Sequence, residues 1–134
     1  MPAAPFDWSN YLMLADELGS RFEEAALRSA VSRAYYYVYH LALERAERNG
    51  FAPIRGESTH VQLWRLFKKS PEPTCVNLAE IALRLKEKRE RADYNNSFIR
   101  LADEIQPLLT DARAFAVMLS GLAPRHPNPA SIRQ

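Results

Sequence analysis

The 134-residue sequence has little of what several common protein classes require. Its single cysteine, Cys75, excludes a disulfide framework and a zinc site built from cysteines, and it fits a reducing compartment. The longest stretch without Asp, Glu, Lys or Arg is residues 114–124, whereas a membrane-spanning helix needs about 20 apolar residues. The first residues lack the basic and apolar regions of a secretory signal. These absences predict a cytoplasmic protein with no membrane span.

Residues that favour β-strands are also scarce. The chain has 5 Val, 5 Ile and 3 Thr, against 19 Ala and 16 Leu. Because Ala and Leu favour helices and β-branched residues favour strands, the composition predicts an all-α fold. The length supports one hydrophobic core. We therefore expect a single domain over residues 1–122, followed by a flexible tail over residues 123–134, which contains three prolines.

Apolar residues recur at helical spacing in five segments, which predicts five helices. The expected helices cover residues 8–22, 23–49, 58–69 and 74–92, with a last helix around residues 105–119. Phe22 and Val61 fall on the expected apolar faces, and Pro107 should lie in a first turn or mark a kink. The second helix is apolar or aromatic nearly all round over residues 34–43, so it should be central and antiparallel to the fourth.

Two segments are basic, although the formal net charge is only +2. Residues 84–91 carry five cations and two anions, and they are followed by Asp93 and Tyr94. The second group is Arg48, Arg55, Arg65, Lys68 and Lys69, opposed only by Glu57. One interpretation is a solvated surface with ion pairs such as that of Arg89 with Asp93. If both groups share one face, a phosphate-bearing partner is the alternative.

Four tyrosines crowd residues 33–40 of the expected central helix: Tyr35, Tyr36, Tyr37 and Tyr39. They cannot all face one direction, so some should pack in the core while others could form a second surface such as a dimer interface. Arg33 and His40 are seven residues apart and share a helix face. A structural role for His40 is the alternative to a functional one. The sequence has no metal-ligand spacing and no Gly-rich phosphate loop, so we expect no metal and no cofactor.

Three blocks of sequence together resemble the HEPN domain family (higher eukaryotes and prokaryotes nucleotide-binding). Residues 26–40 are similar to its aromatic second helix, and Thr59 and His60 with Leu63 and Phe67 are similar to its short third helix. The third block is Leu85 with Arg89, Arg91, Ala92, Asp93 and Tyr94, similar to the Arg-x-x-Ala-Asp-Tyr ending of one branch. The chain looks most like the small stand-alone prokaryotic members.

The resemblance implies a HEPN-like up-and-down antiparallel bundle of about five helices that forms a homodimer. Active members of the family are metal-independent endoribonucleases that use a motif of Arg, four to six intervening residues and then His, placed at the dimer interface. Arg89 matches that Arg, but Tyr94 stands where the His is expected. A phenol with a pKa near 10 is a poor general base at neutral pH.

Two functions follow as hypotheses. The first is a HEPN-like protein that binds a nucleotide, RNA or a nucleotidyltransferase-type partner, in a toxin–antitoxin-like pair. Its expected ligand-binding residues are Arg33, Arg89, Asp93 and Tyr94. The alternative is a ribonuclease toxin in which Arg89 acts with Tyr94 or His40. Under either hypothesis, these five residues should converge in a polar cleft between two helices.

Overall fold

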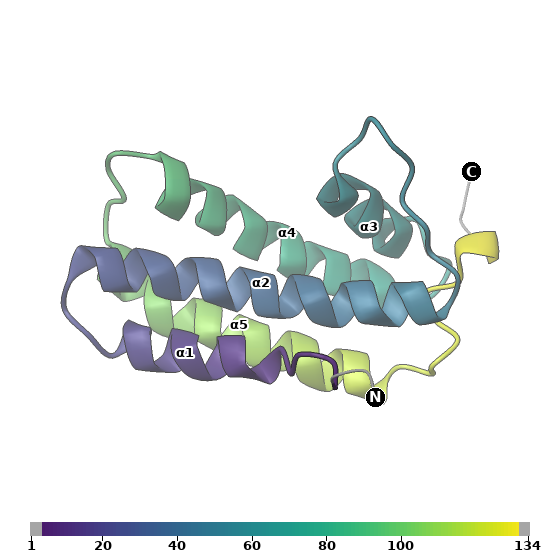
Figure 1. The fold of residues 1–134 in the computed structure, drawn as a ribbon, viewed down its shortest axis with the longest axis horizontal. Coiled ribbons are helices and arrows are strands. Elements are labelled where there is room, and N and C mark those ends of the chain that lie inside the picture. The colour runs from purple at the N-terminus through teal and green to yellow at the C-terminus, as the bar shows by residue number, and fades with distance from the viewer. Residues whose placement is uncertain (1–3, 132–134) are drawn as a thin grey trace.

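Five α-helices form a bundle in the computed structural model, which describes residues 4–131 (Figure 1). They are α1 (Ser9–Gly19), α2 (Glu24–Arg48), α3 (Thr59–Lys68), α4 (Pro73–Tyr94) and α5 (Leu101–Gly121), and a short 3-10 helix covers Pro129–Ser131. No strand is present within residues 4–131, so the predicted all-α class is confirmed. No helix in this part of the chain is both long and apolar enough to cross a membrane.

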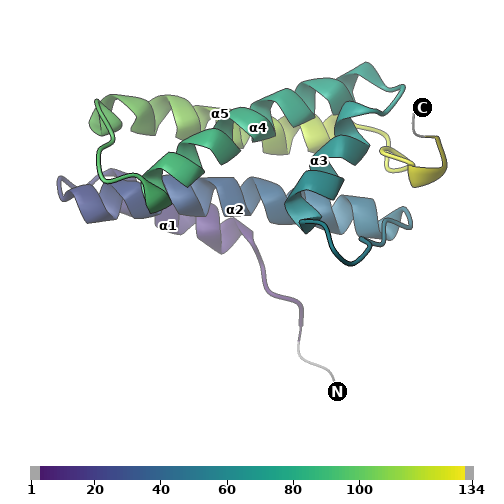
Figure 2. The same ribbon diagram turned by 90° about the horizontal axis from the view of Figure 1, so that it is seen from above.

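The central helix of the bundle is α2, which packs against α1, α4 and α5. Figure 1 shows that α1 and α2 run in opposite directions, as do α2 and α4 and then α4 and α5. The predicted antiparallel arrangement of α2 and α4 is therefore confirmed. The short α3 packs mainly on α4 and crosses the end of α2 (Figure 2).

Small side chains allow the neighbouring helices to approach α2 closely. Ala30, Ala34, Ala42 and Ala46 are fully buried along it. At the end of α1, a Cβ atom added to Gly19 would lie only 2.8 Å from Cγ2 of Ile105 on α5. The large buried side chains include Trp64, Phe67 and Phe115. The core thus combines close contacts along α2 with bulky residues from α3 and α5.

One chain buries most of the tyrosine cluster. Tyr35, Tyr37 and Tyr39 are buried, and only Tyr36 is half-buried, on the side of α2 that faces Arg89 of α4. The prediction that some of these tyrosines pack in the core is confirmed. The bundle therefore accommodates the cluster without needing a second surface to cover it.

Several local expectations are wrong. α1 ends at Gly19 rather than at Phe22, whose side chain is 96% exposed in the connection to α2. Val61 is exposed, because α3 packs through Leu63, Trp64, Leu66 and Phe67. α4 ends at Tyr94 with Asn95 as its C-cap, close to the expected end. Pro107 lies inside α5 beyond its first turn, which excludes one of its two expected positions and leaves the expected kink a prediction.

The segment after α5 is held against the C-terminal end of α2 through residues 123–127. Arg45, a buried cation on α2, donates hydrogen bonds to the carbonyls of Leu119, Ala123 and His126, at 2.8, 3.4 and 3.0 Å. The amide of Asn49 donates to two further carbonyls in residues 124–127. The flexibility expected of residues 123–134 stays a prediction, and residues 132–134 lie outside the described part of the chain.

Candidate functional site

Arg89 projects from α4 against the central helix. Its Nη2 atom donates a hydrogen bond to the Tyr36 hydroxyl at 2.6 Å, and its guanidinium carbon lies 5.1 Å from the Tyr36 ring centroid. The side chain is 16% exposed. A cation near an aromatic ring is stabilised by the negative face of the ring. Arg89 is therefore a partly buried charge whose position is fixed by α2.

Asp93 supplies the opposite charge one helical turn later. Its Oδ2 atom lies 3.0 Å from Nε of Arg89 and 3.4 Å from the Ser32 hydroxyl on α2, which donates to it. The Nε–H of Arg89 is buried, and its direction does not meet the geometry of a hydrogen bond to Asp93. The pair is thus an electrostatic contact that neutralises part of the charge of Arg89.

Tyr94 gives Arg89 a second aromatic neighbour. Its ring centroid lies 5.6 Å from the guanidinium carbon, and its side chain is 72% exposed. Arg89 therefore has Asp93 near Nε and Tyr36 on Nη2, whereas Nη1 makes no hydrogen bond to any residue in 4–131. The arrangement leaves one donor edge of a fixed guanidinium beside an exposed phenol ring.

The other two expected site residues lie on the α1 side of α2. The guanidinium carbon of Arg33 lies 5.0 Å from the ring centroid of Tyr11 on α1. The His40 ring stacks on Trp8, with ring centroids 3.4 Å apart and planes 3° apart. Both side chains are near Tyr11, since the His40 ring centroid lies 6.5 Å from it, and this agrees with their expected shared face. The structure thus brings Arg89, Asp93 and Tyr94 together, whereas Arg33 and His40 lie beside Tyr11 of α1.

His40 is nevertheless a neighbour of the Arg89 group. Its ring centroid lies 6.4 Å from that of Tyr36, the residue that Arg89 contacts. Burial lowers the pKa of His40, because loss of water penalises the charged imidazolium. The imidazole is therefore favoured in its neutral form, which can accept a proton.

His60 is a further neighbour to which sequence reasoning assigned no role. Its ring stacks on Tyr39 at 4.0 Å between centroids and lies 5.9 Å from Tyr36. Burial and the positive charges of Arg89 and Lys86 lower the pKa of His60 to about 4. The only feature of the sequence that pointed to His60 was its place beside Thr59 at the start of the short third helix.

Hydrogen bonds define which nitrogen of His60 carries the proton. Tyr35 accepts a hydrogen bond from Trp64 Nε1 at 3.0 Å and lies 2.6 Å from Nδ1 of His60. Burial raises the pKa of Tyr35, so its hydroxyl keeps its proton and can donate it to Nδ1. The neutral His60 ring then carries its hydrogen on Nε2. Assigned in this way, Nε2 is a hydrogen-bond donor and not a general base.

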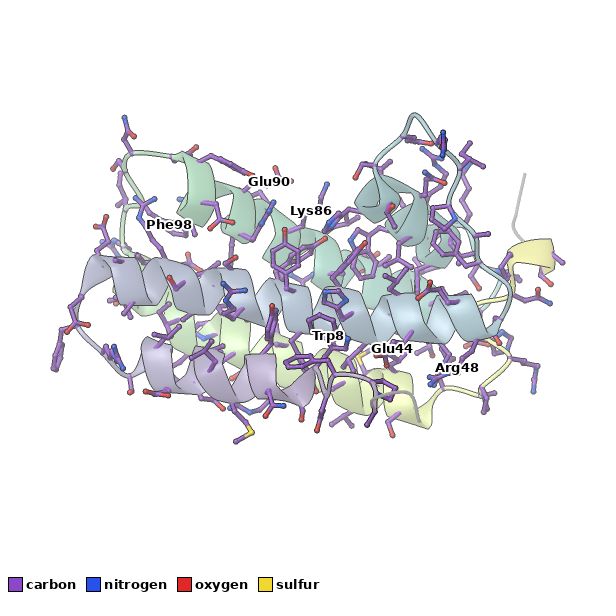
Figure 3. The ribbon with its side chains drawn as sticks, in the orientation of Figure 1. Trp8, Glu44, Arg48, Lys86, Glu90 and Phe98 are labelled. Carbon is purple, nitrogen blue, oxygen red and sulfur yellow. The ribbon has the colours of Figure 1, made fainter. Side chains whose placement is uncertain are left out.

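The two basic segments come together only in part: Lys86 of the first lines one pocket with Arg65, Lys68 and Lys69 of the second, whereas the other cations of residues 84–91 do not line it. In residues 84–91, Lys88 pairs with Glu104 of α5 at 2.8 Å and Arg91 lies over Phe98, whereas Arg89 faces α2. Arg48 lies at the far end of α2 from Glu90 (Figure 3). A phosphate-bearing ligand would therefore meet a local group of cations and not a basic stripe. Within residues 4–131, no group of three potential metal-ligating side chains is present.

Comparisons of the chain with protein-family models, with curated proteins and with solved structures found no match.

Proposed function

We propose that this chain is a HEPN-like protein that binds the phosphate of a nucleotide or RNA at Arg89. The observation that carries the proposal is the position of Arg89, a fixed guanidinium between Tyr36 and the exposed Tyr94. Arginine recognises phosphate through charge-assisted hydrogen bonds, and aromatic rings stack with unpaired bases. Arg89 can therefore bind the phosphate of a nucleotide, while the exposed ring of Tyr94 can stack on its base.

The ligand would use the donor edge that the protein leaves open. Nη1 of Arg89 can donate to a phosphate oxygen while Nη2 remains bonded to Tyr36. Because that second bond holds the guanidinium in place, binding costs less side-chain entropy than it would for a free surface Arg. Asp93 opposes this step, since its carboxylate repels a phosphate. Affinity thus depends on the balance between Arg89 and Asp93.

Equilibrium binding tests this proposal. Fluorescence anisotropy with a labelled single-stranded RNA, and calorimetry with a nucleoside monophosphate, should show that Arg89→Ala weakens binding about tenfold or more. A charge-assisted bond is worth about 1.5–3 kcal/mol, which corresponds to about 10- to 100-fold. Arg84→Ala is the matched control, because Arg84 is an exposed cation on the same helix. Equal binding by all three proteins would leave Arg89 as a structural partner of Asp93.

The ribonuclease alternative is favoured by one observation. His40 has a lowered pKa and can act as a base at neutral pH, and its ring centroid lies 6.4 Å from that of Tyr36, the residue that Arg89 contacts. In this alternative, Arg89 stabilises the phosphorane charge, and His40 or Tyr94 transfers the proton of the 2′-hydroxyl or the leaving group. RNA cleavage in the presence of a chelator, lost in Arg89→Ala and in His40→Ala or Tyr94→Phe, would support it. Absence of cleavage by the wild-type protein leaves the binding function.

We also propose that the chain forms a homodimer next to the end of α4. Ile99 follows α4 in the chain and is 75% exposed, and a second copy would cover this apolar side chain. Light scattering should then give about twice the chain mass of 15.3 kDa. A nucleotidyltransferase-type protein partner in a toxin–antitoxin-like pair is a proposal that rests on the sequence resemblance alone. Co-purification with such an enzyme encoded beside this chain tests it.

A further inference from the structure

A pocket separate from the Arg89 group lies between α3 and α4. Its volume is about 580 Å³. Three apolar residues line it: Val61 and Trp64 from α3, and Leu83 from α4. Val61 and Leu83 are 39% and 36% exposed, so apolar surface is in contact with water there. Covering this surface is favourable in proportion to the apolar area that is removed from water.

Trp64 gives the pocket an apolar floor. The residue is only 2% exposed, and its single polar atom, Nε1, donates to the Tyr35 hydroxyl. Indole has no other hydrogen-bonding atom, so Trp64 can offer a ligand only carbon surface. Because so little of Trp64 is exposed, Val61 and Leu83 supply most of the apolar surface that an aromatic or aliphatic body would cover.

Four cations surround this apolar floor. Arg65 forms an ion pair with Glu57, and Lys86 of α4 lies 3.4 Å from Glu90 (Figure 3). Lys68 and Lys69 make no ion pair with any carboxylate in residues 4–131. The lining residues include no Asp or Glu. The rim of the pocket thus carries positive charges, and those of Lys68 and Lys69 are not neutralised by an ion pair within the described residues.

We propose that the pocket between α3 and α4 binds a small organic anion with an apolar or aromatic body. The body covers Trp64, Val61 and Leu83, while a carboxylate, sulfonate or phosphate lies among Lys68, Lys69 and Lys86. Pockets that bind small molecules are typically about 300–1,000 Å³ in volume and mostly apolar, with a few polar groups that orient the ligand. Arg89 is not among the lining residues, so this site is independent of the proposed phosphate site.

The probe for this test is 8-anilinonaphthalene-1-sulfonate, an aromatic anion whose fluorescence rises on binding. The neutral N-phenyl-1-naphthylamine has the same aromatic body without the sulfonate. We expect saturable binding of the anion at one site, and binding of the neutral compound that is at least tenfold weaker. In ¹⁵N spectra, the amides that shift should be those of α3 and of the Leu83–Lys86 turn.

Three variants separate the pocket from general dye binding. The double variant Lys68→Ala/Lys69→Ala should bind the anion at least tenfold more weakly, and Leu83→Asp should abolish binding. Arg84→Ala is the control that should bind as the wild type does, since Arg84 is an exposed cation next to Leu83 but does not line the pocket. Circular dichroism must show the same helix content in all variants, because this probe also binds partly unfolded chains.

Three results would overturn the proposal. The first is no saturable binding by the folded wild-type protein, and the second is equal binding by the wild type and the lysine double variant. The third comes from a peptide of alternating Glu and Leu, added in a parallel ¹⁵N titration. Shifts of the pocket amides with the peptide but not with the anion would make the pocket a docking site for an acidic protein segment.

Discussion

The Nη2 atom of Arg89 on α4 donates a hydrogen bond to the hydroxyl of Tyr36 on α2, with 2.6 Å between the two heavy atoms. The bond joins two antiparallel helices at the point where the candidate site lies. It also fixes the guanidinium in place before any ligand arrives, which is a form of preorganisation. The stability of the bundle and the geometry of the site are therefore coupled through one contact.

Tyr36→Phe tests this coupling. The substitution removes the hydroxyl but keeps the ring, so the protein should lose about 1–2 kcal/mol of unfolding free energy, the usual cost of a hydrogen bond to a charged group. Urea denaturation measures the change. Tyr94→Phe is the matched control, because Tyr94 is exposed and its hydroxyl makes no hydrogen bond within residues 4–131. Equal stability of the two variants would show that the Arg89–Tyr36 bond contributes nothing.

Asp93→Asn should strengthen the binding of nucleoside monophosphate. The substitution removes a negative charge 3.0 Å from Nε of Arg89 while it keeps a side chain of the same size. A gain of about three- to tenfold in affinity corresponds to the removal of about 1 kcal/mol of repulsion in a partly exposed setting. Glu80→Gln, an exposed position on the same helix, should leave the affinity unchanged. Weaker binding by Asp93→Asn would mean that Asp93 orients Arg89 for the ligand.

The lowered pKa of His60 predicts a loss of stability in mild acid. The pKa is about 4 in the folded protein and 6.5 in a model peptide. Between pH 6.5 and pH 4, the unfolded chain therefore binds a proton at this residue that the folded chain does not bind. Stability from this group is complete above pH 6.5 and falls as the pH drops towards 4.

The size of this effect is about 1–2 kcal/mol, less than the full shift would give, because His60 is only half-buried. His60→Gln keeps an acceptor for the Tyr35 hydroxyl and removes the titration. Urea unfolding at pH 7 and pH 4.5 should show a smaller acid loss in this variant than in the wild type. His40, whose pKa is also lowered, contributes equally to both proteins. An identical loss of unfolding free energy in the wild type and in His60→Gln would contradict a lowered pKa of His60 in the folded protein.

Two glycine substitutions test how α1 packs on α5. In Gly19→Ala, the new methyl would lie 2.8 Å from Cγ2 of Ile105, a β-branched side chain that moves little. We expect a loss of about 1–3 kcal/mol from overpacking. In Gly121→Ala, no atom lies within 4 Å of the new methyl, so stability should stay unchanged or rise by up to about 1 kcal/mol. Thermal unfolding of both variants measures the difference, and equal stability would contradict the close contact.

The helices could be predicted from the sequence because each has a periodic apolar face that a neighbour buries. The exact ends could not, because they depend on local contacts. Phe22 continues the apolar spacing of α1, yet α1 ends at Gly19 and the chain turns before Phe22 can reach the core. Val61 has the right spacing on α3, but Leu63, Trp64, Leu66 and Phe67 form the buried face, which leaves Val61 exposed in the pocket between α3 and α4.

The candidate site was predictable only within single helices. Asp93 and Tyr94 follow Arg89 by four and five residues on α4, about one to one and a half turns, so their proximity follows from the helical repeat. Arg33 and His40 share a face for the same reason. Which neighbour that face meets depends on how the helices pack, and it is α1, through Tyr11 and Trp8. The contact of Arg89 with Tyr36 and the nearness of His60 are set by the same packing, which spacing alone does not encode.

The most direct test of the proposed function follows the Nε–H group of Arg89 itself. In a ¹⁵N spectrum of arginine side chains, its signal is assigned as the one missing from Arg89→Lys. Titration with a nucleoside monophosphate should shift this signal in proportion to the bound fraction, with the backbone amides of residues 89–94 shifting at the same concentrations. Shifts elsewhere in the protein at ligand saturation, with the Arg89 signal unmoved, would contradict the proposal that Arg89 binds the phosphate.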